Sequence, residues 1–243
     1  MSIAVFCLLT FASLSAQTAT GAAPAFQPKY PGVQADDLLP ETQFSTHEPG
    51  YAGLIWWIPT EFWQVSAEAH GRSMSADFKS LDDYTTVAIF FAKVGDLGNF
   101  DFANGADLRK NLVLRDADGN EYRPLEEVSS GATSLKGILK PMLAGAMGKL
   151  GENMEIMYFP ALNKKGQRIA SATSKGQFSF VLKDTLGMKE HVTQVETPLT
   201  ALSPKKFCPV DHRKMIASWS FCPWHGVALE DKSNASTAVP AKK

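Results

Sequence analysis

The chain has 243 residues, of which 44% are hydrophobic and 20% are charged, and its 24 Lys and Arg residues nearly balance its 25 Asp and Glu residues. A chain of this length forms one large domain, or one domain with a small appendage. The near-neutral balance argues against a nucleic-acid partner, and no apolar run reaches the roughly 18 residues that a transmembrane span requires.

Residues 1–16 have the pattern of a secretory signal peptide. The stretch from Ile3 to Phe11 is almost entirely apolar, and small residues follow up to Ala16. The protein is therefore expected to be exported, either to a periplasm or to the outside of the cell. Removal of the peptide would leave two cysteines, Cys208 and Cys222, in an oxidising compartment, where cysteines either pair or bind a metal.

Three segments are expected to lack regular structure. Residues 17–50 are rich in Ala, Thr, Pro and Gln without periodicity, and predict a flexible, acidic lead-in. Residues 186–206 contain two prolines and predict a linker. Residues 231–243 are polar and predict a disordered tail.

Residues 51–185 show the pattern of an antiparallel β-sandwich. Short segments rich in aromatic and β-branched residues alternate with turn residues, which favours an immunoglobulin-like sandwich of about seven or eight strands. The turn at 116–119 is typical of a hairpin, because its glycine readily adopts a positive φ. The expected strands are 54–58, 62–69, 85–94, 111–115, 121–123, 154–159, 168–173 and 177–183.

One segment inside this domain has helical periodicity. Leu135, Leu139, Leu143 and further apolar residues up to Leu150 recur at spacings of three and four. Pro141 is expected to kink or start this helical insertion. Two placements are open: a basic amphipathic helix that touches a membrane, or a helix that packs over one open end of the sandwich, which the short, glycine-rich sequence favours.

An aromatic cluster at the start of the domain has two interpretations. Trp56, Trp57 and Trp63 could form a platform for a sugar or a peptide, or they could fill the sandwich core, which is the simpler reading. Nearby, Glu61 and His70 would be an acid–base pair of an enzyme only if they share a cleft.

Residues 207–230 contain two copies of one short motif. Cys208-Pro-Val-Asp211 and Cys222-Pro-Trp-His225 are separated by ten residues. A Cys-Pro turn of this kind, here called a knuckle, directs two side chains and adjacent backbone N–H groups at one point. Two facing knuckles form a tetrahedral cage, the geometry that zinc prefers.

This stretch resembles a short zinc ribbon, of the form Cys-Pro-x-Cys-Gly, a ten-residue hairpin, and Phe-Cys-Pro-x-Cys-Gly-x-x-Leu. The spacing and both prolines match, as do Phe221, Gly226 and Leu229. The resemblance covers about 23 residues and implies a small zinc-ribbon-like hairpin attached to the sandwich.

The resemblance implies a zinc site made of two thiolates, one carboxylate and one imidazole. Its ligands would be Cys208, Asp211, Cys222 and His225, with Asp211 and His225 in place of two cysteines of the pattern. His212 replaces the usual glycine and is a substitute ligand for Asp211, whose carboxylate would weaken the site.

A disulfide between Cys208 and Cys222 is the competing interpretation. It would close a loop of about fifteen residues and contribute about 3 kcal/mol on the loop-entropy model. Export and the two replaced ligand positions favour the disulfide, and the ligand geometry favours the metal. Both alternatives are open at this point.

The sequence thus predicts an exported, non-catalytic β-sandwich that binds a protein or another component of the cell envelope, with its C-terminal hairpin as a structural or docking element. The alternative is a periplasmic or extracellular protein that binds zinc or copper through the Cys/His/Asp cluster of that hairpin.

Overall fold

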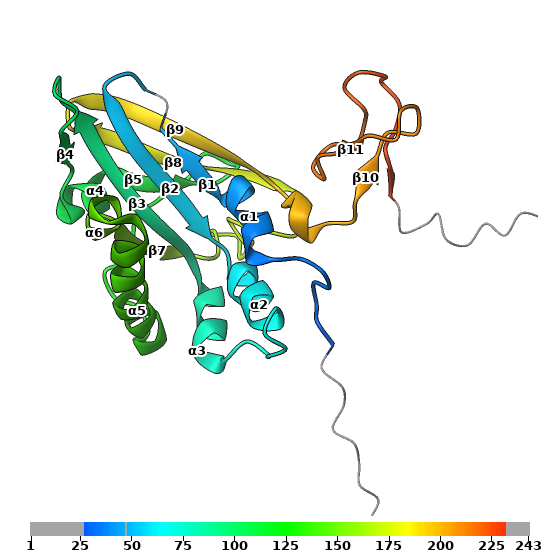
Figure 1. Cartoon of the computed structure of the whole chain (residues 1–243), viewed down its shortest axis with the longest axis horizontal. Coiled ribbons are helices and arrows are strands. Elements are labelled where there is room, and N and C mark those ends of the chain that lie inside the picture. The colour runs from blue at the N-terminus through cyan, green and yellow to red at the C-terminus, as the bar shows by residue number, and fades with distance from the viewer. Residues whose placement is uncertain (1–26, 47, 232–243) are drawn as a thin grey trace, which may run out of the picture.

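The computed structural model describes residues 27–46 and 48–231 (Figure 1). Antiparallel sheets dominate these residues and a few helices cover them, so the predicted mainly β class is confirmed. The proposed signal peptide (1–16) and nearly all of the expected tail (231–243) lie outside the described residues. None of the helices in the described part has the length and apolar character needed to span a bilayer.

The first sheet is built around one long strand, β3. Two strands pair with one edge of β3: β4 with its C-terminal end and β7 with its N-terminal half. Strand β2 pairs with the other edge of β3, and β1 pairs with the outer edge of β2. The strands are β1 (Gln43–Ser45), β2 (Tyr51–Ile58), β3 (Tyr84–Val94), β4 (Phe100–Phe102) and β7 (Glu155–Pro160).

The second sheet has the strand order β6-β5-β8-β9. Its strands are β5 (Leu112–Arg115), β6 (Glu121–Tyr122), β8 (Gly176–Thr185) and β9 (Met188–Thr197). The predicted hairpin joins β5 to β6. Gly119 has a φ of +84°, and the Asp116 carboxylate accepts hydrogen bonds from the N–H groups of Asp118 and Asn120 at 3.0 and 2.8 Å.

The two sheets enclose one apolar core. Trp57 on β2 is 1% exposed and meets the ring of Phe178 on β8 edge-on, with ring centroids 4.9 Å apart. Phe159 on β7 and Phe180 on β8 are also fully buried in this core. The immunoglobulin-like form of the sandwich is not confirmed by this strand order.

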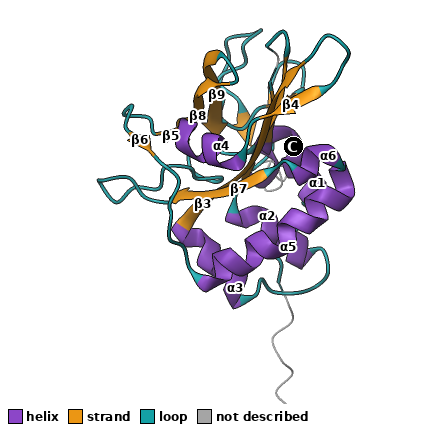
Figure 2. Cartoon of the chain, turned by 90° about the vertical axis from the view of Figure 1, so that its left-hand side faces the viewer, coloured by secondary structure: helices purple, strands orange, loops and turns teal. Residues whose placement is uncertain are grey.

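Helices cover the other face of the first sheet. Figure 2 shows α2, α3 and α5 on one side of β3 and β7, with β5, β8 and β9 on the opposite side. These helices are α2 (Thr60–Glu68), α3 (Ala76–Lys79) and α5 (Ser130–Met147). The 3-10 turn η1 (Ser80–Asp83) connects α3 to β3, and the short helix α6 (Lys149–Glu152) follows α5. As a result, eight consecutive residues of β3, from 85 to 92, are buried.

The predicted helical insertion is confirmed as α5, but its placement differs from the expectation. It lies on a sheet face rather than over an open end, because Leu135, Leu139 and Leu143 pack against the outward side chains of β3 and β7. The hydroxyl of Tyr158 on β7 donates to the Ala132 carbonyl at 2.7 Å, and burial raises the pKa of Tyr158 to about 12. Helix α5 continues through Pro141 without ending.

Two expected strands are wrong. Residues 62–69 lie in or directly after α2, where Val65 is fully buried in the core between the sheets and Trp63 packs in the cluster on the outer face of the first sheet. Residues 168–173 are irregular apart from one bridge between Leu162 and Arg168.

Two expected irregular segments are also wrong. The lead-in (17–50) contains α1 (Ala35–Thr42) as well as β1, and Leu38 is fully buried in the core. The linker (186–206) contains β9, which pairs with β8 along its length and buries Val195. Its charged side chains are tolerated because β9 is an edge strand with one solvated face.

A small C-terminal module, residues 206–231, lies beyond the end of the sandwich (Figure 1). Its sheet has the order β11-β10-β12, from β10 (Lys206–Phe207), β11 (Lys214–Met215) and β12 (Glu230–Asp231). The 3-10 turn η2 (Thr200–Leu202) connects it to β9, and the N–H of Ala217 donates to the Thr200 hydroxyl at 3.3 Å.

Glu155 on β7 joins two helices to the first sheet. Its side chain is 13% exposed and forms ion pairs with Arg109 of α4 (Gly105–Asn111) at 2.8 Å and with Lys136 and Lys140 of α5 at 2.6 and 3.6 Å. Burial alone would raise the pKa of Glu155, but the three cations outweigh it and hold the pKa below its usual value.

Replacement of Trp57 by alanine is expected to lower the free energy of unfolding by about 3–5 kcal/mol, because a large buried side chain leaves a cavity between the sheets. Urea denaturation followed by circular dichroism measures this. The Leu97→Ala control, at a side chain 97% exposed, should change stability by less than about 0.5 kcal/mol. A Trp57→Ala effect no larger than that of the control would show that the sheets do not share this core.

The Glu155 ion pairs predict a pH dependence. The folded-state pKa lies below the unfolded value, so the stabilisation is complete above the unfolded pKa and is lost as pH falls through the folded pKa. Glu155→Gln should therefore lower stability at neutral pH and flatten its decline between about pH 5 and pH 3. Urea midpoints across this range provide the measurement, with exposed Glu190→Gln as control. A Glu155→Gln decline as steep as that of the control contradicts the assignment.

Candidate metal centre

Three of the predicted ligands converge in the C-terminal module. The Sγ atoms of Cys208 and Cys222 and a ring nitrogen of His225 all lie within 4.8 Å of one another. His225 Nδ1 is 3.4 Å from each sulfur. The two cysteines are buried and His225 is exposed, so the group lies just below the surface of the module.

The two knuckles have the same backbone conformation. The N–H of His212 donates to the Cys208 carbonyl at 2.9 Å, and the N–H of Gly226 donates to the Cys222 carbonyl at 2.8 Å. Both N–H donors follow the fourth knuckle position, and both residues have positive φ, +55° for His212 and +65° for Gly226. Glycine suits this conformation, and a histidine there carries strain.

Paired residues close each knuckle loop at the same relative positions. Phe207 pairs with Lys214 around the first loop, and Phe221 bridges to Ala228 around the second. Each residue of the second pair is fourteen positions after its equivalent in the first. The repeated sequence motif therefore folds as a repeated structural unit, with one cysteine at each start.

A small apolar cluster holds the two cysteines in place. Cys208, Cys222 and Met215 are its buried members, and the partly buried Trp219, Val227 and Leu229 pack against them. The ammonium group of Lys206 donates to the Trp219 carbonyl at 2.7 Å and fixes the loop between the knuckles. Of the residues that matched the zinc-ribbon pattern, the two cysteines and Leu229 thus also supply packing for the module.

The two thiols differ in pKa. Burial raises the pKa of Cys208, and side-chain contacts with Cys222 and Asp211 add to the increase, which outweighs the lowering effect of the backbone N–H groups of Asp211 and Val210. Burial also acts to raise the pKa of Cys222. There, hydrogen bonds from the backbone N–H groups of His225 and Trp224, together with the His225 ring, favour the thiolate and bring the pKa below its ordinary value.

Asp211 lies beside the group of three without joining it. Its carboxylate interacts with the Cys208 thiol and is held by Arg213, whose backbone N–H donates at 3.1 Å and whose Nε is 3.3 Å away. Burial acts to raise the pKa of Asp211, but these hydrogen bonds hold it below its usual value. The substitute ligand, His212, is exposed and does not belong to the group.

The two cysteines are free in the structure rather than joined in a disulfide. Two adjacent free thiols and an imidazole have the donor types of a site for zinc or another thiophilic ion. The same proximity keeps the disulfide alternative chemically accessible under oxidising conditions.

The tryptophan cluster is divided between the two cores. Trp57 lies in the core between the sheets, and its 1% exposure leaves no platform surface. Trp56 and Trp63 are partly buried on the outer face of the first sheet, where each contacts Phe62 with ring centroids 5.5 and 5.3 Å apart. The arrangement is that of core packing.

Glu61 and His70 do not share a site. Glu61 lies in the first turn of α2, and His70 follows the end of that helix, where its ring contacts the Ser66 carbonyl at 2.9 Å. The helix from Glu61 to Glu68 spans about 10 Å along its axis, and His70 lies two residues beyond that end, too far for an acid–base pair.

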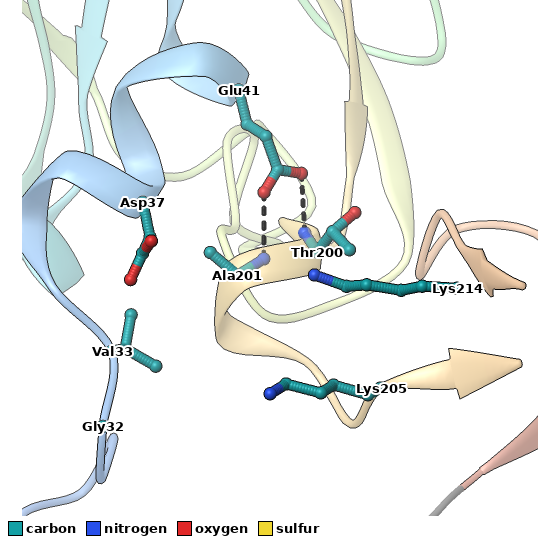
Figure 3. A pocket seen from close by; sticks show the side chains of 8 residues that line it. All are labelled: Gly32, Val33, Asp37, Glu41, Thr200, Ala201, Lys205 and Lys214. Atoms are coloured by element: carbon teal, nitrogen blue, oxygen red, sulfur yellow. Dashed lines mark hydrogen bonds between the residues drawn. The ribbon is translucent and has the colours of Figure 1, made fainter.

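A cavity of about 320 Å³ lies beside η2 and was not predicted from the sequence (Figure 3). No local pattern could mark it, because its walls come from segments that are distant in sequence. It is lined by Gly32, Val33, Asp37, Glu41, Thr200, Ala201, Lys205 and Lys214.

No protein-family model matches the chain, and no curated protein matches it. Among solved structures, a DUF4426 family protein from Pseudomonas aeruginosa PAO1 is similar over 64% of this chain and 93% of its own, with 11% sequence identity and a TM-score of 0.29. A likeness at this TM-score carries no argument about fold or function.

The positive φ of the two knuckles predicts opposite effects of two substitutions. Gly226→Ala should destabilise the module by about 1 kcal/mol, because alanine is strained at this φ. His212→Gly should leave stability unchanged or raise it by up to about 1 kcal/mol. Amide hydrogen exchange in the module measures both. A destabilising His212→Gly would show that the imidazole makes a required contact.

Proposed function

We propose that this protein is a non-catalytic, exported metal-binding protein whose C-terminal module holds one Zn²⁺ ion. The ligands are Cys208, Cys222 and His225, and Asp211 provides the fourth. The β-rich domain carries the module and displays it beyond the end of the two sheets. Export, to a periplasm or outside the cell, is part of the proposal and rests on the sequence of residues 1–16.

The spacing of the three converging ligands carries this proposal. Zinc binds sulfur at about 2.3 Å and nitrogen at about 2.0–2.1 Å, so a tetrahedral site holds these atoms about 3.5 Å apart. The two sulfur–nitrogen distances of 3.4 Å agree with this value. Side chains that merely packed together would not need to place one ring nitrogen equally far from two buried sulfurs.

The donor types support zinc over the hard cations. Thiolate and imidazole ligands suit Zn²⁺ or copper, whereas Ca²⁺ and Mg²⁺ require oxygen ligands. Backbone N–H groups directed at each sulfur favour the thiolate form that a metal needs, and at Cys222 they bring the pKa below its ordinary value, whereas at Cys208 burial outweighs them. Copper is the alternative ion, and competition between the two metals distinguishes them.

Asp211 is better placed than His212 to be the fourth metal ligand. Asp211 occupies the knuckle position equivalent to His225 and already interacts with the Cys208 thiol. Rotation of its side chain toward the three ligands would exchange the contact with Arg213 for a metal bond. His212 is one residue further along, in the strained position that closes the turn.

A second candidate function is a docking role for the module, and the exposure of its apolar side chains supports it. Val210 and Trp224 occupy equivalent knuckle positions and are 57% and 65% exposed, and Phe221 is 63% exposed. Several exposed apolar side chains in one small module are typical of a contact surface. A protein or envelope partner would be held by the module while the metal keeps its loops folded.

Native mass spectrometry of the mature chain from its host tests the metal proposal. One zinc per chain is expected, with both thiols resistant to alkylation until a chelator is added. Cys208→Ser, Cys222→Ser and His225→Ala should weaken zinc binding by at least about a hundredfold, and Asp211→Asn by about tenfold. The control, His70→Ala, should bind zinc as the parent chain does.

The same experiment also identifies the disulfide alternative. A metal-free chain whose mass is lower by two hydrogens, and whose cysteines resist alkylation even after chelation, contains the Cys208–Cys222 disulfide. That outcome contradicts the metal proposal and assigns the module a structural role only.

A further inference from the structure

We infer that the cavity between α1 and the C-terminal module binds a small zwitterion, such as a free α-amino acid or a dipeptide. The lining of the cavity contains none of the metal ligands. Its volume, about 320 Å³, lies at the small end of the range for ligand pockets.

The floor of the cavity is fixed by one carboxylate. Both oxygens of Glu41 on α1 accept hydrogen bonds from the backbone of η2, from the N–H of Thr200 at 2.7 Å and from that of Ala201 at 2.9 Å (Figure 3). Below them Leu38 and Leu199 are buried in the core. The walls are therefore held in place before a ligand arrives, which lowers the entropic cost of binding.

The charges that remain are separated across the cavity. Figure 3 shows Lys205 and Lys214 extending from the module side, with Asp37 and Val33 on the opposite wall. Neither lysine forms an ion pair within the described residues. Asp37 accepts one hydrogen bond, from the N–H of Gln34 at 2.8 Å, through Oδ2. Within residues 27–46 and 48–231, Oδ1 of Asp37 has no hydrogen-bond partner and can accept from a ligand.

This separation of charge selects the class of ligand. A carboxylate would be bound by the two ammonium groups of Lys205 and Lys214, and an ammonium group by Asp37. The lining has balanced charge, two acids and two lysines, so an anion alone or a cation alone would leave one wall unsatisfied. Val33 lies beside Asp37, and Ala201 lies between the two walls, so both offer apolar surface to a short aliphatic side chain (Figure 3).

The test is a titration of the ¹⁵N-labelled full chain, followed by the backbone N–H signals of Gly32, Thr200 and Ala201. The probes are L-alanine and L-alanyl-L-alanine. Two analogues each lack one charge: N-acetyl-L-alanine has no ammonium group and L-alaninamide has no carboxylate. Saturable shifts are expected at the three signals for both probes. Each analogue should bind at least about tenfold more weakly.

Variants assign the binding to the cavity. Asp37→Asn, which keeps an acceptor for the Gln34 N–H, and the double variant Lys205→Gln/Lys214→Gln should each weaken binding by about tenfold. Lys189→Gln on β9 removes the same charge from an exposed site elsewhere and should leave binding unchanged. All variants keep the Glu41 contacts, so unaltered spectra outside the cavity show that they fold.

Three results would overturn the inference: no saturable shift with either probe, equal binding of the analogues, or binding that survives both charge variants. The titration is repeated after chelation. Zinc binding without alanine binding contradicts the cavity inference alone, and alanine binding without zinc binding contradicts the metal proposal alone.

Discussion

The burial of β3 on both faces is the constraint on which the rest of the structure depends. One face contributes to the core with the second sheet, and the other is covered by α5 and by the segment around α2. Burial of apolar surface at both faces is the dominant favourable contribution to such a fold. Because both faces of the first sheet are covered, the C-terminal module lies beyond the end of the domain, where it follows β9 of the second sheet through η2.

Elements were predicted correctly where the apolar pattern of the sequence matches the burial of the element in the fold. β3 was recognised because a strand buried on both faces is apolar throughout, and α5 because a single apolar stripe meets the sheet. The prediction failed for α2, whose aromatic residues favour strands by propensity but pack here on a helix. It also failed for β9, an edge strand with so many charged residues that it looks like a linker.

The same distinction applies to the sites. The knuckles are local, so their repeated motif and its resemblance to a zinc ribbon implied the ligands Cys208, Asp211, Cys222 and His225, and the structure brings the two cysteines and His225 together. The conformation of each turn is encoded in five residues that begin with Cys-Pro. The cavity beside η2 is assembled from residues 32–41, residues 200–205 and Lys214, and the first two of these segments were expected to be irregular. No local pattern connects Glu41 to Thr200, because their contact depends on how α1 packs on the finished domain.

The order of elements along the chain has a consequence for synthesis. β3 emerges before α5 and before β8, the elements that cover its two faces. During that interval an apolar, β-branched and aromatic segment is exposed, and its composition is that of segments that associate between chains. The strand that contributes to both cores of the finished domain is thus also a segment prone to association until α5 and β8 have covered it.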